Sequence, residues 1–213
     1  MNKQPAAQVY QQIKQDIRDG QLPIGEALKQ TELSERYGVS RMPIRDILRR
    51  LQAEGWLCPV GKRGLMIPAL NAAEAEDLYL MRMHLEPLLL GFAVPFINNQ
   101  HLGFAEDILK CIDESPHLTL DEHGQYNSHF HLSLYTPANR PTLCASVESL
   151  HQQCARYIGY HNQTLQYVAI SQQEHYEMID MLRRNNTSAA QKMLKHHIRD
   201  AGKLLVEYLR AQK

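Results

Sequence analysis

The sequence has few cysteines, no long apolar run and no net charge. Its four cysteines are widely separated and form no CxxC pair, which fits reduced thiols better than a disulfide framework. The longest apolar stretch, residues 85–97, contains a glutamate and two prolines and is too short to span a bilayer. The first twelve residues are polar and lack the apolar core of a signal peptide. These absences predict a soluble cytoplasmic protein that does not associate with membranes.

The net charge of zero is distributed unevenly along the 213 residues. Residues 1–70 contain 11 lysines and arginines against 7 acidic residues, a net charge of +4. Residues 71–213 contain 12 against 16, a net charge of −4. The length and this change of sign predict two domains, 1–70 and 71–213, of which the basic first domain binds a polyanion.

The first 70 residues have the pattern of a winged helix-turn-helix. Helical apolar spacing over residues 5–19 and 31–37 is followed by a short glycine-containing turn and a third helix that ends near Glu54. Two short β-like runs, 56–60 and 65–69, then flank a basic tip. These runs predict a hairpin, the wing of such a domain.

The third helix is predicted to recognise DNA. Its apolar residues, Ile44, Ile47, Leu48 and Leu51, share one face, so the leading turn and the opposite face present arginines. Arginine there can donate two hydrogen bonds to guanine in a major groove, and the basic wing can contact phosphate. The predicted DNA-binding residues are Ser40, Arg41, Met42, Arg45, Arg49, Lys62 and Arg63. In the alternative interpretation, the arginines are only the solvated face of an amphipathic helix.

The run from Leu33 to Trp56 resembles the GntR family of winged-helix regulators. The family pattern is approximately LA..YGVSRTPVREAL..L..EG. This chain has Met42 in place of the usual threonine, and Ile24 in place of the proline of the usual Pro-Gly turn. Met42 has no hydroxyl to donate to phosphate. The resemblance implies that Arg41 and Arg45 carry most of the base recognition.

After residue 69 the apolar spacing is helical almost throughout. We therefore expect a mainly α protein, with the winged head followed by an all-α antiparallel bundle of six helices. The expected helices are 72–92, 99–114, 121–135, 141–160, 171–184 and 187–210.

Three of these helices each place one histidine on their apolar stripe, namely His131, His175 and His197. The neighbouring His196 falls on the polar side. A bundle that brings the three inward histidines together would form a metal site, with Asn127 as a candidate oxygen ligand. In the alternative interpretation, each histidine is a hydrogen-bonded core residue.

Residues 82–86 (RMHLE) and 130–143 resemble the R..LE and FH..L...N..L motifs of the FCD ligand domain, in its shorter, VanR-like type. In metal-binding members, an aspartate one turn before the first histidine and three histidines hold a divalent cation, which helps to bind a carboxylate effector. The resemblance implies a metal at Asn127, His131, His175 and His197, with zinc ahead of nickel or manganese. Asparagine is a weaker, uncharged substitute for the aspartate.

Arg82 lies in the first FCD-like motif, and it and Arg156 are the candidates to bind the carboxylate of the effector. An ordinary ion pair is the alternative for each. These features predict a homodimeric transcription regulator that binds a pseudo-palindromic operator in double-stranded DNA and responds to a small organic acid.

Two further alternatives remain. In the first, the metal itself is the signal and there is no organic effector. In the second, the body is a metalloenzyme fused to a DNA-binding head. An enzyme is disfavoured because the sequence has no HExxH motif and no evident spare carboxylate beside the histidines.

Overall fold

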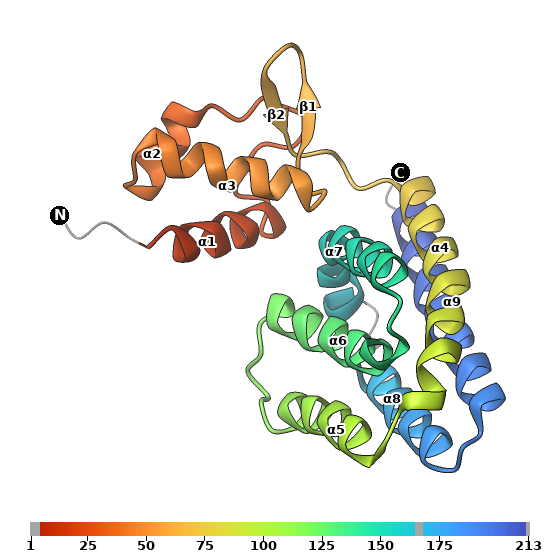
Figure 1. Ribbon diagram of the computed structural model, residues 1–213. Coiled ribbons are helices and arrows are strands. Elements are labelled where there is room, and N and C mark those ends of the chain that lie inside the picture. Colours follow the sequence, from red (N-terminus) through yellow and green to blue (C-terminus); the bar gives the residue numbers. More distant parts are fainter. Residues whose placement is uncertain (1–4, 165–167, 212–213) are drawn as a thin grey trace. The chain divides into compact units, whose positions relative to one another are not determined.

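The computed structural model describes the backbone of residues 5–164 and 168–211, and their side chains except those of 120, 121 and 158–164 (Figure 1). The chain forms two compact units, Met1–Ala69 and Leu70–Lys213. The predicted fold class, mainly α with a winged head followed by a helical domain, is confirmed.

The described part of the first unit contains three helices and a two-stranded hairpin: α1 (Ala6–Arg18), α2 (Gln30–Tyr37), α3 (Arg41–Ala53), β1 (Cys58–Val60) and β2 (Gly64–Met66). The strands pair antiparallel, with Val60 opposite Gly64. Gly38 ends α2 with a φ of 65°, in the left-handed region that favours glycine, and so makes the tight turn into α3. Val9, Ile13, Ile44, Leu51 and Trp56 form the most deeply buried part of this core.

The second unit is helical throughout its described part. Its elements are α4 (Ala72–Ala93), η1 (Val94–Phe96), α5 (Asn99–Asp113), α6 (Leu120–Tyr135), η2 (Thr136–Ala138), α7 (Pro141–Thr164), α8 (Val168–Arg183) and α9 (Thr187–Ala211). The main partner of α4 is α9, and α4 also packs on α7. Helix α6 packs on α5 and α7, while α8 packs on α5 and α9. The six expected helices are therefore present, with ends that differ by at most four residues from the prediction.

The start of α6 is set by a capping box. The Thr119 hydroxyl accepts from the amide of Glu122 (3.3 Å), and the Glu122 carboxylate accepts from the amide of Thr119 (2.8 Å). A helix that begins here places Phe130, His131 and Leu134 on its buried side. The cap thus fixes the N-terminus of the helix that carries the candidate metal ligand His131.

No helix in the described residues is long and apolar enough to cross a membrane. The four cysteines, all within the described residues, are free thiols: Cys58, Cys111, Cys144 and Cys154. Disulfides therefore do not contribute to the described fold, which depends on helix packing.

Candidate metal centre and nucleic-acid interface

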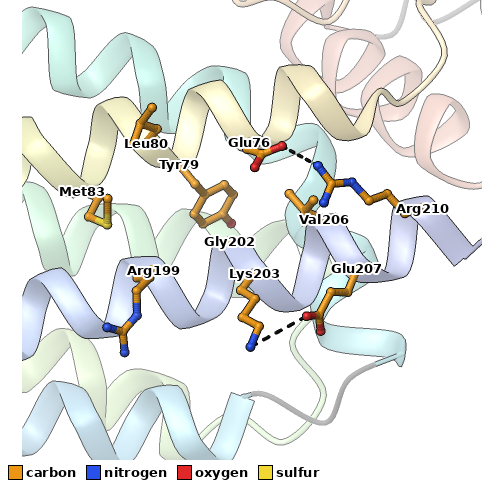
Figure 2. A pocket seen from close by; sticks show the side chains of 10 residues that line it. All are labelled: Glu76, Tyr79, Leu80, Met83, Arg199, Gly202, Lys203, Val206, Glu207 and Arg210. Atoms are coloured by element: carbon orange, nitrogen blue, oxygen red, sulfur yellow. Dashed lines mark hydrogen bonds and ion pairs between the residues drawn. The ribbon is translucent and has the colours of Figure 1, made fainter.

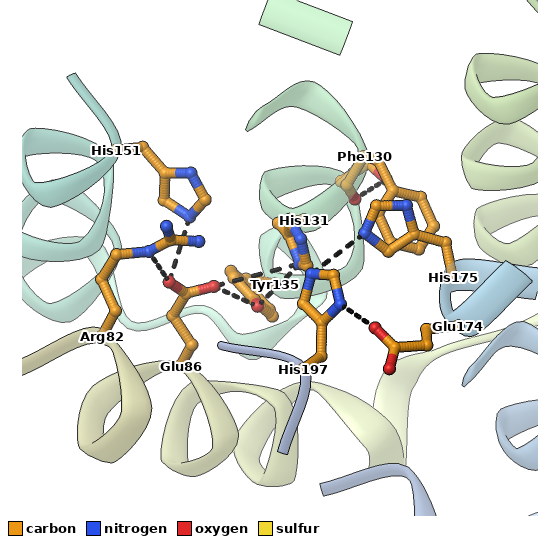
Figure 3. Close-up of polar contacts among 10 residues, drawn as sticks. Arg82, Glu86, Phe130, His131, Tyr135, His151, Glu174, His175 and His197 are labelled. Atoms are coloured by element: carbon orange, nitrogen blue, oxygen red, sulfur yellow. Dashed lines mark hydrogen bonds and ion pairs between the residues drawn. The ribbon is translucent and has the colours of Figure 1, made fainter. Parts of the chain in front are cut away.

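His131 on α6, His175 on α8 and His197 on α9 point toward one another inside the second unit (Figure 3). All three residues are at most 4% exposed. One ring nitrogen of each histidine lies within 4.8 Å of a ring nitrogen of each of the others. The Nε2 atoms of His175 and His197 are 3.3 Å apart. The packing of three helices thus brings together the histidines that the sequence placed on inward faces.

The arrangement fits a bound cation. Two nitrogens at about 2.0–2.1 Å from a tetrahedral zinc are about 3.3–3.4 Å apart, close to the observed separation of His175 and His197. Nε2 of His131 is buried and has no hydrogen-bond partner in the described residues. Burial lowers the pKa of His131 and of His175 well below the usual range, which keeps both neutral, as metal ligands must be. The cluster could therefore hold a metal ion.

Polar groups also contact the outer sides of these rings. Nδ1 of His197 lies 2.7 Å from Oε2 of Glu174, and Nδ1 of His131 lies 3.5 Å from the Tyr135 hydroxyl and 4.0 Å from Oε2 of Glu86. A carboxylate on Nδ1 keeps the proton on that atom and leaves the lone pair of Nε2 for a metal.

Two carboxylates that the sequence analysis did not identify lie beside the histidines. Glu174 on α8 reaches across to His197 on α9, and Glu86 comes from α4, so both contacts arise from tertiary packing. Neither carboxylate is free to act as a general base, because Glu174 contacts His197 and Glu86 forms an ion pair with Arg82.

A second buried polar cluster surrounds Glu86. Its Oε1 accepts from Nε of Arg82 (2.6 Å) and lies 3.2 Å from Nε2 of His151, while its Oε2 accepts from the Tyr135 hydroxyl (2.7 Å). Burial alone would raise the pKa of Glu86, but the nearby Arg82 and then His151 hold it well below its usual range. Glu86 is therefore ionised, and Tyr135 links this cluster to His131.

Two members of this cluster had usable sequence signals that the prediction missed. His151 follows Val147 by four residues and precedes Cys154 by three, so it shares their buried face of α7. Glu86 follows Arg82 by four residues, the spacing of a helical ion pair. Glu174 had no comparable signal, because its partner is on another helix.

The predicted effector residues are in different environments. Arg82 is buried and paired with Glu86, so its charge is already balanced. Nη2 of Arg156 lies 2.9 Å from Oε2 of Glu74, but its Nε and Nη1 are buried with no hydrogen-bond partner in the described residues. Asn127 is half-buried on α6, one turn before His131, and its role as a ligand stays a prediction.

The head presents its candidate DNA-binding residues to solvent. The buried residues of helix α3 are Ile44, Ile47, Leu48 and Leu51, as the sequence predicted. Ser40 immediately precedes the first turn of this helix. Met42 is 67% exposed. The exposed set comprises all the residues predicted to bind DNA, namely Ser40, Arg41, Met42, Arg45, Arg49, Lys62 and Arg63.

Other cations of the head are engaged within the fold. Arg36 is 2.7 Å from Asp16, and Arg50 is 2.8 Å from Glu54. Arg45 has only a 3.9 Å contact with Asp46. Within the described residues, the candidates that form no ion pair are Arg41, Arg49, Lys62 and Arg63. Among these candidates, the positive charge without an ion pair therefore lies on α3 and at the hairpin tip.

A winged helix-turn-helix with an exposed basic helix, followed by a helical domain, is typical of DNA-binding regulators. Residues 5–67 match the model of the bacterial regulatory proteins, gntR family, and residues 77–200 match that of the FCD domain. The chain belongs to the GntR-family regulators that carry an FCD domain. It is a DNA-binding transcription regulator and not an enzyme, as the sequence predicted.

Similar proteins are regulators as well. The chain is 31% identical over 110 residues to the uncharacterized HTH-type transcriptional regulator YdhC of Bacillus subtilis. The matched region covers 52% of this chain and 49% of that protein. It is 28% identical over 160 residues to the Nta operon transcriptional regulator of Aminobacter aminovorans, which covers 74% of each. The solved structure of E. coli McbR/YncC has the same fold, with a TM-score of 0.73 at 20% identity over 96% of this chain and 98% of that one.

Proposed function

We propose that this regulator binds a divalent cation at His131, His175 and His197, together with the carboxylate of a small organic acid. Binding changes the affinity of a homodimer for its operator. The observation that carries this proposal is a set of buried polar atoms that lack hydrogen-bond partners among the described residues of the second unit.

These atoms require two opposite kinds of hydrogen-bond or ligand partner. Nε2 of His131 offers a lone pair and needs a cation or a donor, whereas Nε and Nη1 of Arg156 need an acceptor. Each buried polar atom that stays unpaired costs about 1–3 kcal/mol, and native proteins contain few of them. A cation on the histidines and a carboxylate on Arg156 satisfy both kinds of group.

The ligand set also bears on which metal binds. Imidazole nitrogen suits zinc and nickel, whereas manganese prefers carboxylate and water oxygen. Three neutral histidines, with or without the neutral Asn127, leave the full +2 charge of the cation in place. This charge attracts an anionic effector, so metal and acid are expected to bind cooperatively.

A chain of buried contacts connects the metal site to the first helix of the second unit. His131 is adjacent to the Tyr135 hydroxyl, which donates to Glu86, which in turn pairs with Arg82 on α4. Helix α4 is covalently joined to the head through the residues just before Ala72. Occupancy of the site would act on the head by shifting α4.

On DNA, the two heads of the dimer contact two half-sites. Arg41 and Arg45 read base edges, Arg49 and the hairpin tip contact the backbone, and the exposed Ser40 hydroxyl donates to phosphate. Met42 cannot donate a hydrogen bond, but its exposed side chain suits contact with a thymine methyl group.

Thermal unfolding with and without metal tests the effector proposal. We expect a subset of small carboxylates to raise the melting temperature of zinc-loaded protein but not of EDTA-stripped protein. A ligand at 100 times its Kd adds about 2.7 kcal/mol of stability. Arg156→Met should abolish the acid-dependent shift and keep the zinc-dependent shift. Stabilisation by acids that does not depend on zinc would contradict the proposal.

In one alternative, the metal alone is the signal. This alternative is favoured by the ion pair between Arg82 and Glu86, because an arginine whose charge is already balanced attracts the carboxylate of an effector less strongly. In that case zinc would change operator affinity in a gel-shift titration and no carboxylate would change it further. The same titration therefore separates the two forms of the proposal.

The contact between Glu174 and His197 gives a separate prediction. Glu174→Gln should weaken zinc affinity about 10- to 100-fold, because an amide holds the Nδ1 side of the His197 ring less firmly than a carboxylate and so orients Nε2 less well toward the metal. The matched control is Glu177→Gln, three residues along the same helix, where the carboxylate accepts from Gln173 and contacts none of the three histidines by any hydrogen bond within the described part of the chain. Competition titration with a chelating dye measures both affinities, and equal affinities would rule out a role for Glu174 in supporting the metal.

A further inference from the structure

His151 is a buried histidine that the proposed metal site does not use. It lies on α7 and is 2% exposed. Neither nitrogen of its ring makes a hydrogen bond with the described residues, although Nε2 is 3.2 Å from Oε1 of Glu86. Buried polar atoms without a partner are rare in native proteins, because such an atom loses its hydrogen bonds to water and gains none in return. The ring of His151 therefore indicates a bound partner.

The surroundings of this ring determine which kind of partner it requires. Nε2 faces the ionised carboxylate of Glu86, which keeps the ring proton on that nitrogen (Figure 3). Arg82 already balances the charge of Glu86, so a second proton on the ring would be a buried charge without a counter-ion of its own. The ring is therefore neutral, and Nδ1 offers a lone pair. Its partner has to be a hydrogen-bond donor such as a hydroxyl group, since an ionised carboxylate can only accept.

His151 lies beside the proposed metal site. Its ring centre is 5.7 Å from that of His131, one of the three candidate metal ligands. Both rings also approach Glu86, because Nδ1 of His131 lies 4.0 Å from Oε2 of the same carboxylate. A small acid bound at a cation on His131 would therefore have His151 as a near neighbour.

The groove between α4 and α9 is the other place where an acid could be sought. It has a volume of about 390 Å³ and is lined by three cationic side chains (Figure 2). Each of these cations lies within 4 Å of a carboxylate, with N–O distances of 2.8, 3.8 and 2.6 Å for Arg199 with Asp200, Lys203 with Glu207 and Arg210 with Glu76. Among the described residues, the groove thus offers an acid no cation whose charge is still unbalanced.

We propose that His151 is a specificity-determining residue of the effector site and selects acids that carry a hydroxyl group. The hydroxyl donates to Nδ1 of His151, while the carboxylate of the same molecule binds as proposed above. A protonated amino group could also donate, but the +2 charge of the neighbouring metal disfavours it. The effector is therefore a hydroxycarboxylic acid. The inference rests on the proposed function, because it requires an acid bound beside the metal.

Acids that differ in one substituent test the class of effector. One series is lactate, its analogue with fluorine in place of the hydroxyl, and propionate; the other is malate, fluorosuccinate and succinate. Fluorine has nearly the size of a hydroxyl group but cannot donate a hydrogen bond. In calorimetric titrations of zinc-loaded, full-length protein, we expect a hydroxy acid to bind about 10- to 100-fold more tightly than its two analogues, which leave Nδ1 buried and unpaired.

Two substitutions of His151 separate a contact with the effector from a structural role. Asparagine places an amide oxygen close to the position of Nδ1. Glutamine places its amide close to the position of Nε2 and so keeps a contact with Glu86. We expect His151→Asn to retain most of the preference for the hydroxy acid and His151→Gln to lose it. Circular dichroism and zinc titration check that both variants are folded and hold the metal.

The outcomes distinguish this inference from the proposed function. If none of the acids binds to zinc-loaded wild-type protein, the proposed function itself is contradicted. Equal affinities for hydroxy acids and their analogues would overturn the role of His151, leave the proposed function standing and assign the place beside Nδ1 to water.

The two variants add a second criterion. A preference that persists in His151→Gln would overturn the inference, because the hydroxyl would then bind elsewhere, such as on the metal. A preference lost in both variants would overturn it as well, since Nδ1 would not be the acceptor.

Discussion

Replacing His175 or His197 with alanine is expected to remove most of the bound metal. Each substitution deletes one of three ring nitrogens that lie within 4.8 Å of one another, and no other histidine whose side chain is described belongs to that group. We expect purified wild-type protein to hold about one divalent cation per chain and either variant to bind zinc at least about 100-fold more weakly, since a site with two ligands falls short of the three or four that protein zinc sites use.

His196→Ala is the matched control for this experiment. His196 is adjacent to His197 in the sequence but exposed, so its loss should leave the metal content unchanged. Elemental analysis and calorimetric titration measure content and affinity. Wild-type protein that stays free of metal after reloading with zinc, nickel or manganese would return these histidines to a role in core packing.

Arg45→Ala is expected to cost about 1–3 kcal/mol of specific binding and to relax the base preference at one position of each half-site. The guanidinium of Arg45 is exposed on α3 and has only a 3.9 Å contact with Asp46, so it is available for a guanine edge. Lys62→Ala or Arg63→Ala should instead weaken binding to every sequence and reduce the salt dependence, because each removes a phosphate contact.

Arg45→Lys provides the control for charge alone. Lysine retains the positive charge but cannot make the paired hydrogen bonds of a guanidinium, so it should restore salt-dependent affinity without restoring specificity. An operator selected from random DNA with the wild-type protein serves as the probe in fluorescence anisotropy titrations. Unchanged affinity and base preference in Arg45→Ala would show that α3 is not the recognition helix.

The sequence by itself determined which side of each helix faces inward. The spacing of 3.6 residues per turn is local, so the inward positions of His131, His175 and His197 and the outward position of His196 follow from neighbours a few residues away. The same holds for the exposed face of α3. The helix ends were predictable for a related reason, since capping and turn residues act within a few positions of each end.

Only the tertiary structure decided which inward residues meet. The angle and register at which helices pack depend on side chains along the whole contact, and periodicity contains no information about them. For this reason the sequence did not reveal that Glu174 reaches His197 or that Glu86 balances the charge of Arg82. It also did not reveal that two buried nitrogens of Arg156 have no hydrogen-bond partner among the described residues. The residue spacing within each helix makes its histidine face inward. Only the packing of α6, α8 and α9 brings the three rings within 4.8 Å of one another.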